Sequence, residues 1–443
     1  MGAIWGEGRR VLNRSMIADN KTTEETPKDR PFNPFRIPKS DSANVLVCDV
    51  VNQLQNFESH RRPRKRKRRQ KDQQTFERTV ATVVSDLVHR YVTEPDGYLA
   101  VTLSKQILGR SGCYRSPVLN GTLPNVLKNL AKPDMAFVEL EKGHQGYFNN
   151  AKQSTIKAGV RLITRINNLE LSTSDFAIDP CQEVIILKKA KSDIFDNGEW
   201  MEYQDTDQIK QYREQLDRIN RWIEKADIKL DPIIALENDS DVSDRLLRRY
   251  FNNGSFKMGG RLFGGFWQNL KKEERQKGIT ISGHSIITLD YSQMAPRILY
   301  SMVGLNTPLT DPYDLPRWRF YRNGIKKVFN ALLFAEKPLQ RFPKDTKKLF
   351  FPNAKIQNVV EDITKQHNSV SHLFYTRPGF KILFIESEIL ISVLLKLIDK
   401  GIVALPVHDA VIIPETAKDV AVQVMEETFS ELTGIQGKVH MEN

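Results

Sequence analysis

Residues 285–297 read SIITLDYSQMAPR, an apolar run that ends at the carboxylate of Asp290. The run from Ile286 to Leu289 predicts a buried strand. Pro296 suits the first turn of a helix that follows directly. A carboxylate at the end of a buried strand is held rigidly, as a metal ligand must be. Standing alone, the same acid would be interpreted as a helix cap. Whether Asp290 is a metal ligand therefore depends on residues elsewhere in the chain.

A second acid stands between two apolar runs near the C-terminal end. Residues 402–413 read IVALPVHDAVII, with His408-Asp409 where a hairpin usually carries Asn-Gly or Asp-Gly. We expect a hairpin tip that presents Asp409 beside Asp290, so that two carboxylates share one magnesium-binding surface. Phosphoryl transfer needs such a surface, because two cations stabilise the attacking and the leaving oxygen. The alternative is an ordinary polar turn.

A basic helix face is predicted between these two acids. Residues 322–326 read RNGIK, and Arg322, Lys326, Asn330 and Phe334 follow one another at intervals of four. On a helix these side chains share one face, which would present two cations and an aromatic ring to an incoming triphosphate. The alternative is an amphipathic helix whose basic residues are only solvated.

In this order the three stretches resemble motifs A, B and C of the family A DNA polymerases, the Pol I class. They supply DYSQ followed after three residues by Arg, then Arg-x3-Lys-x7-aromatic-small, then Val-His-Asp between apolar strands. Upstream, Gly259-Gly260-Arg261-Leu262 looks like the TGRL element that contacts the primer–template in that family. The resemblance covers residues 240–443. It implies an α+β right-hand polymerase with an antiparallel palm sheet, reduced fingers and a helical thumb. Residues 205–229, whose apolar residues have helical spacing, are the candidate thumb; a plain packing helix is the alternative.

The resemblance also implies which residues act on which ligand. It predicts two Mg²⁺ ions, for which Mn²⁺ can substitute, and a triphosphate held by cations. The roles implied are Asp290 and Asp409 as ligands of both metals, the Tyr291 carbonyl as a further ligand, Lys326 and Arg322 at the triphosphate, Phe334 beside the nascent pair, Arg297 as a buttress, His408 at the primer terminus and Arg261 on the primer–template.

The sequence departs from the family pattern at three places. Ala295 stands where family A DNA polymerases have a glutamate that blocks a ribose 2′-hydroxyl, so we expect ribonucleotides to be accepted, as in the related single-subunit RNA polymerases. Asn330 replaces an aromatic residue, and Ala410 replaces an acid. Glu386 and Glu388, on a predicted helix before the hairpin, would offer a substitute carboxylate; a solvated helix face is the favoured alternative.

Composition favours a polyanionic partner. The chain has 443 residues, a net charge of +12 and a pI near 9.4, and Lys and Arg gain affinity for phosphates by releasing condensed counterions. Nucleic acid is the first expectation and an anionic membrane surface the second. No apolar run approaches the roughly 20 residues that cross a bilayer. We expect a protein of the prokaryotic or viral host cytoplasm, associated with the nucleoid, or of the nucleus in a eukaryote.

The N-terminal half divides into two predicted parts. Residues 1–72 are expected to form a disordered arm, whose block from Arg61 to Lys71 grips DNA or, alternatively, is a solvated linker. Residues 73–175 predict helices at 76–91, 104–108 and 124–130 and a hairpin with strands at 135–140 and 145–148, in the order of a winged helix-turn-helix; an unspecified small α+β domain is the alternative. The cations of the block assigned to DNA are Arg64, Lys65, Arg66, Lys67, Arg68 and Arg69.

These features predict a DNA-dependent nucleotidyltransferase in residues 176–443. It would use a DNA template, a primer or nascent strand, and dNTPs, NTPs or both, without a membrane partner. Relaxed sugar choice and an attached DNA-binding module favour a primase-polymerase of a plasmid, phage or mobile element, although this step is an argument from architecture. The alternatives are a conventional primer-dependent DNA polymerase and a catalytically inactive replication initiator.

Overall fold

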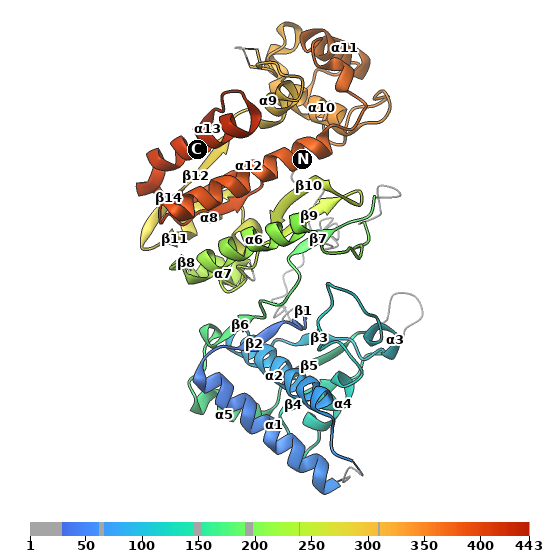
Figure 1. The fold of residues 1–443 in the computed structure, drawn as a ribbon, viewed down its shortest axis with the longest axis vertical. Helices are drawn as coiled ribbons and strands as arrows, with labels where there is room; N and C mark the ends of the chain where they lie inside the picture. Colours follow the sequence, from blue (N-terminus) through green and yellow to red (C-terminus); the bar gives the residue numbers. More distant parts are fainter. Residues whose placement is uncertain are drawn as a thin grey trace, which may run out of the picture. The chain divides into compact units, whose positions relative to one another are not determined.

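The computed structural model describes residues 29–61, 66–144, 152–190, 198–238, 240–308 and 311–442 (Figure 1). The chain separates into two compact units, which among these residues cover 29–183 and 184–442. Each unit packs around a hydrophobic core of its own. The described helices include none that is both long and apolar enough to cross a membrane. The fold class is α+β, as the sequence predicts.

The N-terminal unit combines helices with short strands. Its four-stranded sheet has the order β1-β3-β5-β4, and β2 pairs separately with β6. The elements are β1 (Arg30–Pro31), β2 (Arg36–Pro38), α1 (Asp41–Arg61), α2 (Gln70–Thr93), β3 (Leu99–Val101), α3 (Lys105–Leu108), α4 (Leu123–Leu130), β4 (Val138–Glu141), β5 (Ser154–Ala158), α5 (Val160–Asn168) and β6 (Phe176–Ile178).

The disordered arm expected for residues 1–72 is wrong for the part that the structure describes. Residues 41–61 form the helix α1, which packs against α2 and buries Leu46, Val50 and Leu54. These residues recur at helical spacing, so their apolar face is covered by the core rather than left in water. The first unit also extends to residue 183, past the expected boundary at 175, because β6 pairs with β2.

In its described part, the basic block has Arg61 at the end of α1 and residues 66–71 leading into and beginning α2. Arg68 pairs with Glu58 of α1, and its guanidinium lies 3.7 Å from the centre of the Phe76 ring. Arg68 therefore helps to hold the two helices together. Arg66, Lys67 and Arg69 are exposed, whereas Arg64 and Lys65 lie outside the described residues.

The three helices expected between residues 73 and 130 are present as α2, α3 and α4. The Thr122 side chain makes no capping hydrogen bond at the start of α4; instead the Thr122 N–H donates to Asn120 Oδ1 at 2.7 Å. The first hairpin strand is β4, but the second is β5 at 154–158. The strand expected at 145–148 lies outside the described residues, next to the bridge between His144 and Lys152.

A buried ion-pair cluster fastens the N-terminal strands to α2, and it yields a prediction. Asp86 is fully buried, and it accepts from Arg30 at 2.6 Å, from Arg36 at 3.0 Å and from the Asn33 N–H at 2.7 Å. Asp86→Asn should destabilise this unit by about 3–5 kcal/mol, because it removes the buried negative charge that Arg30 and Arg36 both bind. Urea unfolding monitored by hydrogen exchange in α2 measures the effect. The control Asp96→Asn removes an exposed acid and should leave the midpoint almost unchanged.

The C-terminal unit has a mixed arrangement of one large sheet, one small sheet and surrounding helices. Its elements are β7 (Ile185–Leu187), α6 (Asp207–Lys225), β8 (Ile228–Leu230), α7 (Pro232–Glu237), β9 (Arg248–Asn252), β10 (Ser255–Phe263), α8 (Lys272–Gly278), β11 (Ile279–Ile281), β12 (His284–Tyr291), α9 (Met294–Ser301), the 3-10 helix η3 (Pro316–Tyr321), α10 (Arg322–Phe334), α11 (Ile356–Gln366), α12 (Gly379–Asp399), β13 (Leu405–Val407), β14 (Ala410–Pro414), α13 (Lys418–Thr433) and β15 (Val439–Met441).

The larger sheet is antiparallel throughout and has β12 at its centre. The strand order is β13-β14-β12-β11-β8, and β15 pairs with the end of β12. The smaller sheet has the order β10-β9-β7. Helix α12 packs against β10, α13, α6 and α9, and in Figure 1 it crosses the middle of the unit obliquely. The strand carrying Asp290 is thereby supported by neighbouring strands and covered by helices.

Candidate active site

The end of β12 and the tip of the β13–β14 hairpin meet at one edge of the sheet. The β12–β14 register runs from Ile286 opposite Pro414 to Leu289 opposite Val411. One step further, the register brings Asp290 to the beginning of β14, where the two-residue turn holds Asp409. His408 adopts a left-handed conformation with φ of 59°, which lets so short a turn close. The hairpin predicted from the sequence is thus present, with Asp409 at its tip.

The two acids act on each other electrostatically. Burial and the nearby charge of Asp409 raise the pKa of Asp290 from 3.8 to about 7, with Glu442 adding to the rise and Lys326 opposing it. Among the described residues, Asp290 Oδ1 is a buried oxygen without a hydrogen-bond partner. A buried, unpartnered carboxylate oxygen next to a second acid is a costly arrangement, and a bound cation would relieve it.

This cost leads to a prediction about stability in the absence of metal. Because the folded-state pKa of Asp290 is above its unfolded value, the folded protein loses stability as pH rises from about 4 towards 7. Asp290→Asn should therefore raise the free energy of unfolding of the metal-free protein at pH 8 by on the order of 2 kcal/mol, with a higher unfolding midpoint. The gain is smaller than the full pKa shift would give, because Asp290 is partly exposed to solvent. The gain should shrink as pH falls towards 4.

Thermal unfolding in EDTA and then in magnesium checks this prediction. Magnesium should stabilise the natural protein and leave Asp290→Asn unchanged, since a ligand stabilises only the state that binds it. Asp314→Asn, which alters an exposed acid, is the matched control. A lower midpoint for Asp290→Asn in EDTA at pH 8 would contradict the prediction.

The donors near Asp290 fit a magnesium site of two carboxylates and a carbonyl. Across the described ranges, no cluster of three or more His, Cys, Asp or Glu side chains has metal-binding geometry. Two carboxylates with one backbone carbonyl leave room for water and phosphate oxygens, which is how magnesium usually binds in phosphoryl transfer. Tyr291 is held in place because its hydroxyl donates to the Met425 carbonyl at 2.7 Å. Its backbone is held in the sheet as well, opposite Val439 of β15.

Helix α10 carries the predicted basic face. It begins at Arg322 and ends at Phe334, so the side chains at 322, 326, 330 and 334 lie on one side of it. Arg322 and Lys326 are exposed, and Arg322 pairs with Asp311. Asn330 keeps a buried Oδ1 with no hydrogen-bond partner in the described structure. Phe334 packs edge-on against Phe380 with ring centres 5.3 Å apart.

The turn after β12 is braced by Arg297. Gln293 begins α9 in a left-handed conformation with φ of 60°. Arg297 donates to the Ser292 carbonyl at 3.1 Å and to the Gln436 carbonyl at 3.0 Å. Arg297 therefore joins the segment after β12 to the segment before β15, and its role in supporting a metal site stays a prediction. Ala295, in the first turn of α9, is half-buried.

Arg261 lies in an ion pair that sequence reasoning did not anticipate. Its guanidinium donates to Glu386 of α12 at 2.7 Å. Burial, followed by the charge of Asp409, raises the pKa of Glu386 to about 7, and Arg261 opposes this rise. The solvated helix face favoured for Glu386 is therefore wrong: the side chain is buried and belongs to the same group of charges as Asp409.

Of the two glycines before Arg261, Gly260 lets strand β10 approach α12 closely, whereas Gly259 lies against Tyr250 and Asn252 of β9. Gly260 has φ of 92°, and a Cβ there would lie 2.4 Å from Ser387 Oγ. One strand over, the buried Arg249 donates to Ser387 Oγ at 2.7 Å and pairs with Glu388. Two arginines from neighbouring strands thus bind two acids on one helix, and a Cβ at residue 260 would crowd Ser387 and the Arg249 guanidinium.

His408 and three acids complete the site. Desolvation and the positive charge of Arg261 lower the pKa of His408, so its ring is neutral at pH 7. Its centre lies 6.3 Å from that of Phe263. Asp311, Glu386 and Glu442 were missed as site residues by sequence reasoning; of these only Glu386 was singled out at all, and nothing local distinguishes Asp311 or Glu442 from surface acids.

Known proteins do not identify this arrangement. Comparison with protein-family models and with curated proteins gives no match to the chain. The resemblance of the short motifs to the family A polymerases therefore remains a prediction. The chemistry of the site has to be argued from its own geometry.

Proposed function

We propose that this protein is a template-directed nucleotidyltransferase of the family A type that accepts ribonucleotides. The observation that carries the proposal is the pairing of Asp290 with Asp409 around an unpartnered carboxylate oxygen, within the field of Lys326. In this proposal the sheet around β12 is the palm, α10 and α11 belong to the fingers, and α6 is the candidate thumb.

The residues present divide the work of phosphoryl transfer between them. Two magnesium ions bound by Asp290, Asp409 and the Tyr291 carbonyl would stabilise the attacking 3′-oxygen and the leaving pyrophosphate oxygen. Lys326 and Arg322 would hold the triphosphate and offset its developing charge. Because Arg322 already pairs with Asp311, a triphosphate would share Arg322 with that acid or displace it.

Other residues act on the strand and on the metal ligands. Arg261 is held by Glu386, which orients its guanidinium for the primer–template. His408 is neutral and next to Asp409, so it offers a hydrogen bond at the primer terminus without adding charge. Phe334 supplies an apolar face beside the nascent pair.

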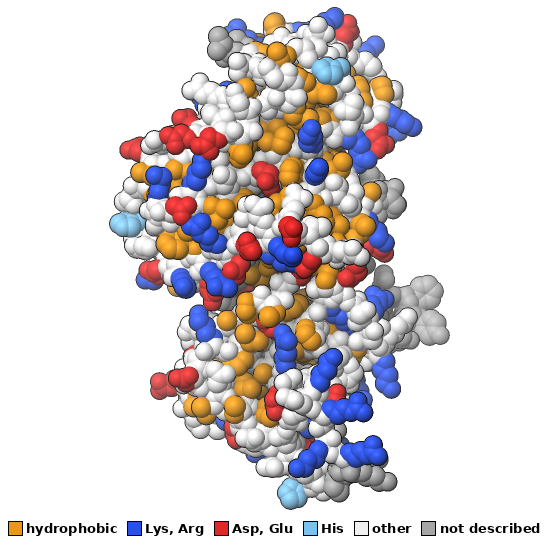
Figure 2. All heavy atoms as spheres, in the orientation of Figure 1, with side chains coloured by type: hydrophobic (Ala, Val, Ile, Leu, Met, Phe, Trp, Pro, Cys, Tyr) orange, Lys and Arg blue, Asp and Glu red, His pale blue; other side chains and the backbone are white. Residues whose placement is uncertain are grey.

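The N-terminal unit supports a role in binding duplex DNA. Its order of α2, β3, α3, α4 and the β4–β5 hairpin, with β5 between β3 and β4, is the order of a winged helix-turn-helix. In that motif the third helix enters the major groove. Asn125 and Lys128 are exposed on α4, and Figure 2 shows Lys and Arg side chains over α4 and the end of α1. A DNA-binding module joined to a polymerase favours initiation of replication in a plasmid, phage or mobile element.

Primer extension with both nucleotide sugars tests the proposal. Purified protein, magnesium and a DNA template are combined with dNTPs or NTPs, with and without a primer. Extension with NTPs supports relaxed sugar choice, and products without a primer support a primase activity. Exclusive use of dNTPs would favour the conventional DNA polymerase, and no product in any combination would favour the inactive initiator.

A further inference from the structure

A second surface of the C-terminal unit, away from the two acids in sequence, combines cations with exposed aromatic rings. Residues 311–366 contain twelve Lys or Arg and six Asp or Glu, so this part of the chain is strongly basic. Within it, η3 reads PRWRFY. Phe320 in η3 is 93% exposed, the highest exposure of any large hydrophobic side chain in the described residues.

The exposure of Phe320 is not a result of a loosely held segment. Its neighbour Trp318 is fully buried, and the Trp318 indole N–H donates to Asp362 of α11 at 2.8 Å. Trp318 also stacks on Phe351, with ring centres 5.4 Å apart and planes 6° from parallel. Phe351 is itself 36% exposed. The helix η3 is therefore anchored by one aromatic residue while it holds another in solvent.

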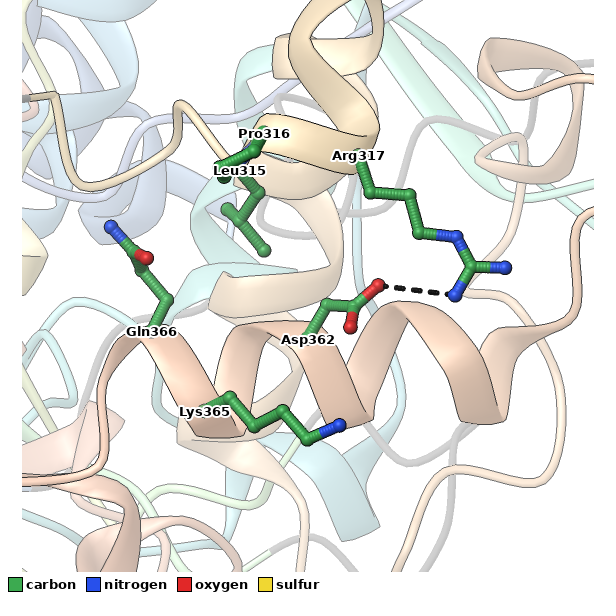
Figure 3. A pocket seen from close by; sticks show the side chains of 6 residues that line it. All are labelled: Leu315, Pro316, Arg317, Asp362, Lys365 and Gln366. Carbon is green, nitrogen blue, oxygen red and sulfur yellow. Dashed lines mark ion pairs between the residues drawn. The ribbon is translucent and has the colours of Figure 1, made fainter.

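Exposed cations stand on η3 and α11. Arg319 is exposed, and the Arg317 side chain is 56% exposed and 3.5 Å from Asp362. Lys365 of α11 is exposed as well. Figure 3 shows Arg317, from η3, and Asp362 and Lys365, from α11, among the residues that line a hollow of about 300 Å³. Arg317 pairs with Asp362, and Lys365 pairs with Glu361. Arg317, Arg319 and Lys365 against Asp362 and Glu361 leave one positive charge beside the hollow.

We propose that this surface, consisting of Arg317, Arg319, Phe320, Phe351 and Lys365, binds single-stranded nucleic acid. Proteins that bind single strands without reading their sequence combine cations along the backbone with aromatic rings on which bases stack. In a duplex the bases already stack on one another, so a projecting ring offers most to an unpaired base. The volume of the hollow is at the lower end of the range for ligand sites, which suits one section of a long ligand.

If the proposed function is correct, the single strand bound here is the unpaired template ahead of the primer terminus. The inference rests on the proposed function in this one respect. Phosphate and base recognition do not require catalysis, so binding can be measured without metal or nucleotide. A failure of primer extension would therefore not contradict the binding of single strands at this surface.

Binding is tested with the full chain in EDTA. Fluorescence anisotropy compares a primer–template carrying a 5′ template overhang, the same duplex with an abasic overhang, and the blunt duplex. Phe320→Ala should weaken binding to the first about fivefold to tenfold, the lower part of the range for base–aromatic stacking, and leave the other two unchanged. Phe320→Trp should restore the affinity. Leu236→Ala, which removes an apolar side chain that is 76% exposed on α7, is the control and should change nothing.

The charged part of the surface has its own readout. Arg319→Ala should weaken binding to all overhangs alike and reduce the salt dependence by about one phosphate contact. Equal affinities of Phe320→Ala and the natural protein for the base-containing overhang would overturn the proposal, as would an equal loss on the abasic overhang. Loss of primer extension in every protein, with the Phe320 effect intact, would sink the proposed function alone.

Discussion

Asp290→Ala and Asp409→Ala should each reduce nucleotidyl transfer by at least about 10³-fold. Charge stabilisation by the metals is worth several kcal/mol, and each 1.36 kcal/mol changes the rate tenfold. Burial and then the charge of Asp409 raise the pKa of Asp290, so the two acids are close enough to interact, and in the proposed site neither can substitute for the other. Single-turnover extension of a preformed primer–template complex measures the rate.

The same variants should still bind DNA. The acids carry negative charge beside a polyanion, so their removal should leave DNA affinity equal or slightly higher. Asp419→Ala, an exposed acid on α13, is the control and should keep full activity. Comparable losses of binding and turnover in Asp290→Ala would mean that Asp290 acts on the fold instead of on the reacting phosphate.

The positions of the two principal acids were predictable because each lies at the end of an apolar run. Ile286 to Leu289 and Val411 to Ile413 are apolar enough to require burial, and burial in one sheet brings their ends together. The basic face of α10 was predictable for a similar reason, since residues four apart on a helix share a side. Local pattern therefore indicated the centre of the site.

The surroundings of these acids could not be predicted in the same way. Glu386 pairs with Arg261 across 125 residues of sequence, and helical periodicity cannot reveal a partner so distant. Asp311 and Glu442 approach the site only after α10 and β15 have packed. Such contacts are products of tertiary structure, and a charged residue on a predicted helix is by default interpreted as solvated.

The helix α1 shows the opposite case: its helical spacing of apolar residues was present in the sequence, but neighbouring prolines and basic residues led to a prediction of disorder. Ala43, Val47, Val50 and Leu54 are spaced as one helical face and are buried. The prolines just before them and the basic block just after them favour disorder. The apolar face prevails because α2 offers a matching surface, and burial of that face supplies most of the stability of such a helix.

The Ala295→Glu substitution should turn relaxed sugar choice into selection for dNTPs. Ala295 is half-buried in the first turn of α9, four residues after Tyr291, whose carbonyl is proposed to bind metal. A longer side chain there would fill the space of a ribose 2′-hydroxyl, and a repulsive element of this kind discriminates without any new attractive contact. We expect NTP incorporation to fall about 10- to 100-fold relative to dNTP incorporation, equivalent to roughly 1.4–2.8 kcal/mol.

Two further variants at residue 295 separate bulk from charge. Ala295→Gln has nearly the size of the glutamate without its charge and should discriminate almost as strongly if the effect is steric. Ala295→Gly should leave NTP use unchanged, because it adds no obstruction. Competition between the two sugars opposite one template base measures the ratio for each variant. If the natural protein already rejects NTPs and Ala295→Glu changes nothing, another residue selects the sugar; Asn330, whose buried carbonyl oxygen has no partner within the described structure, is then the first to substitute.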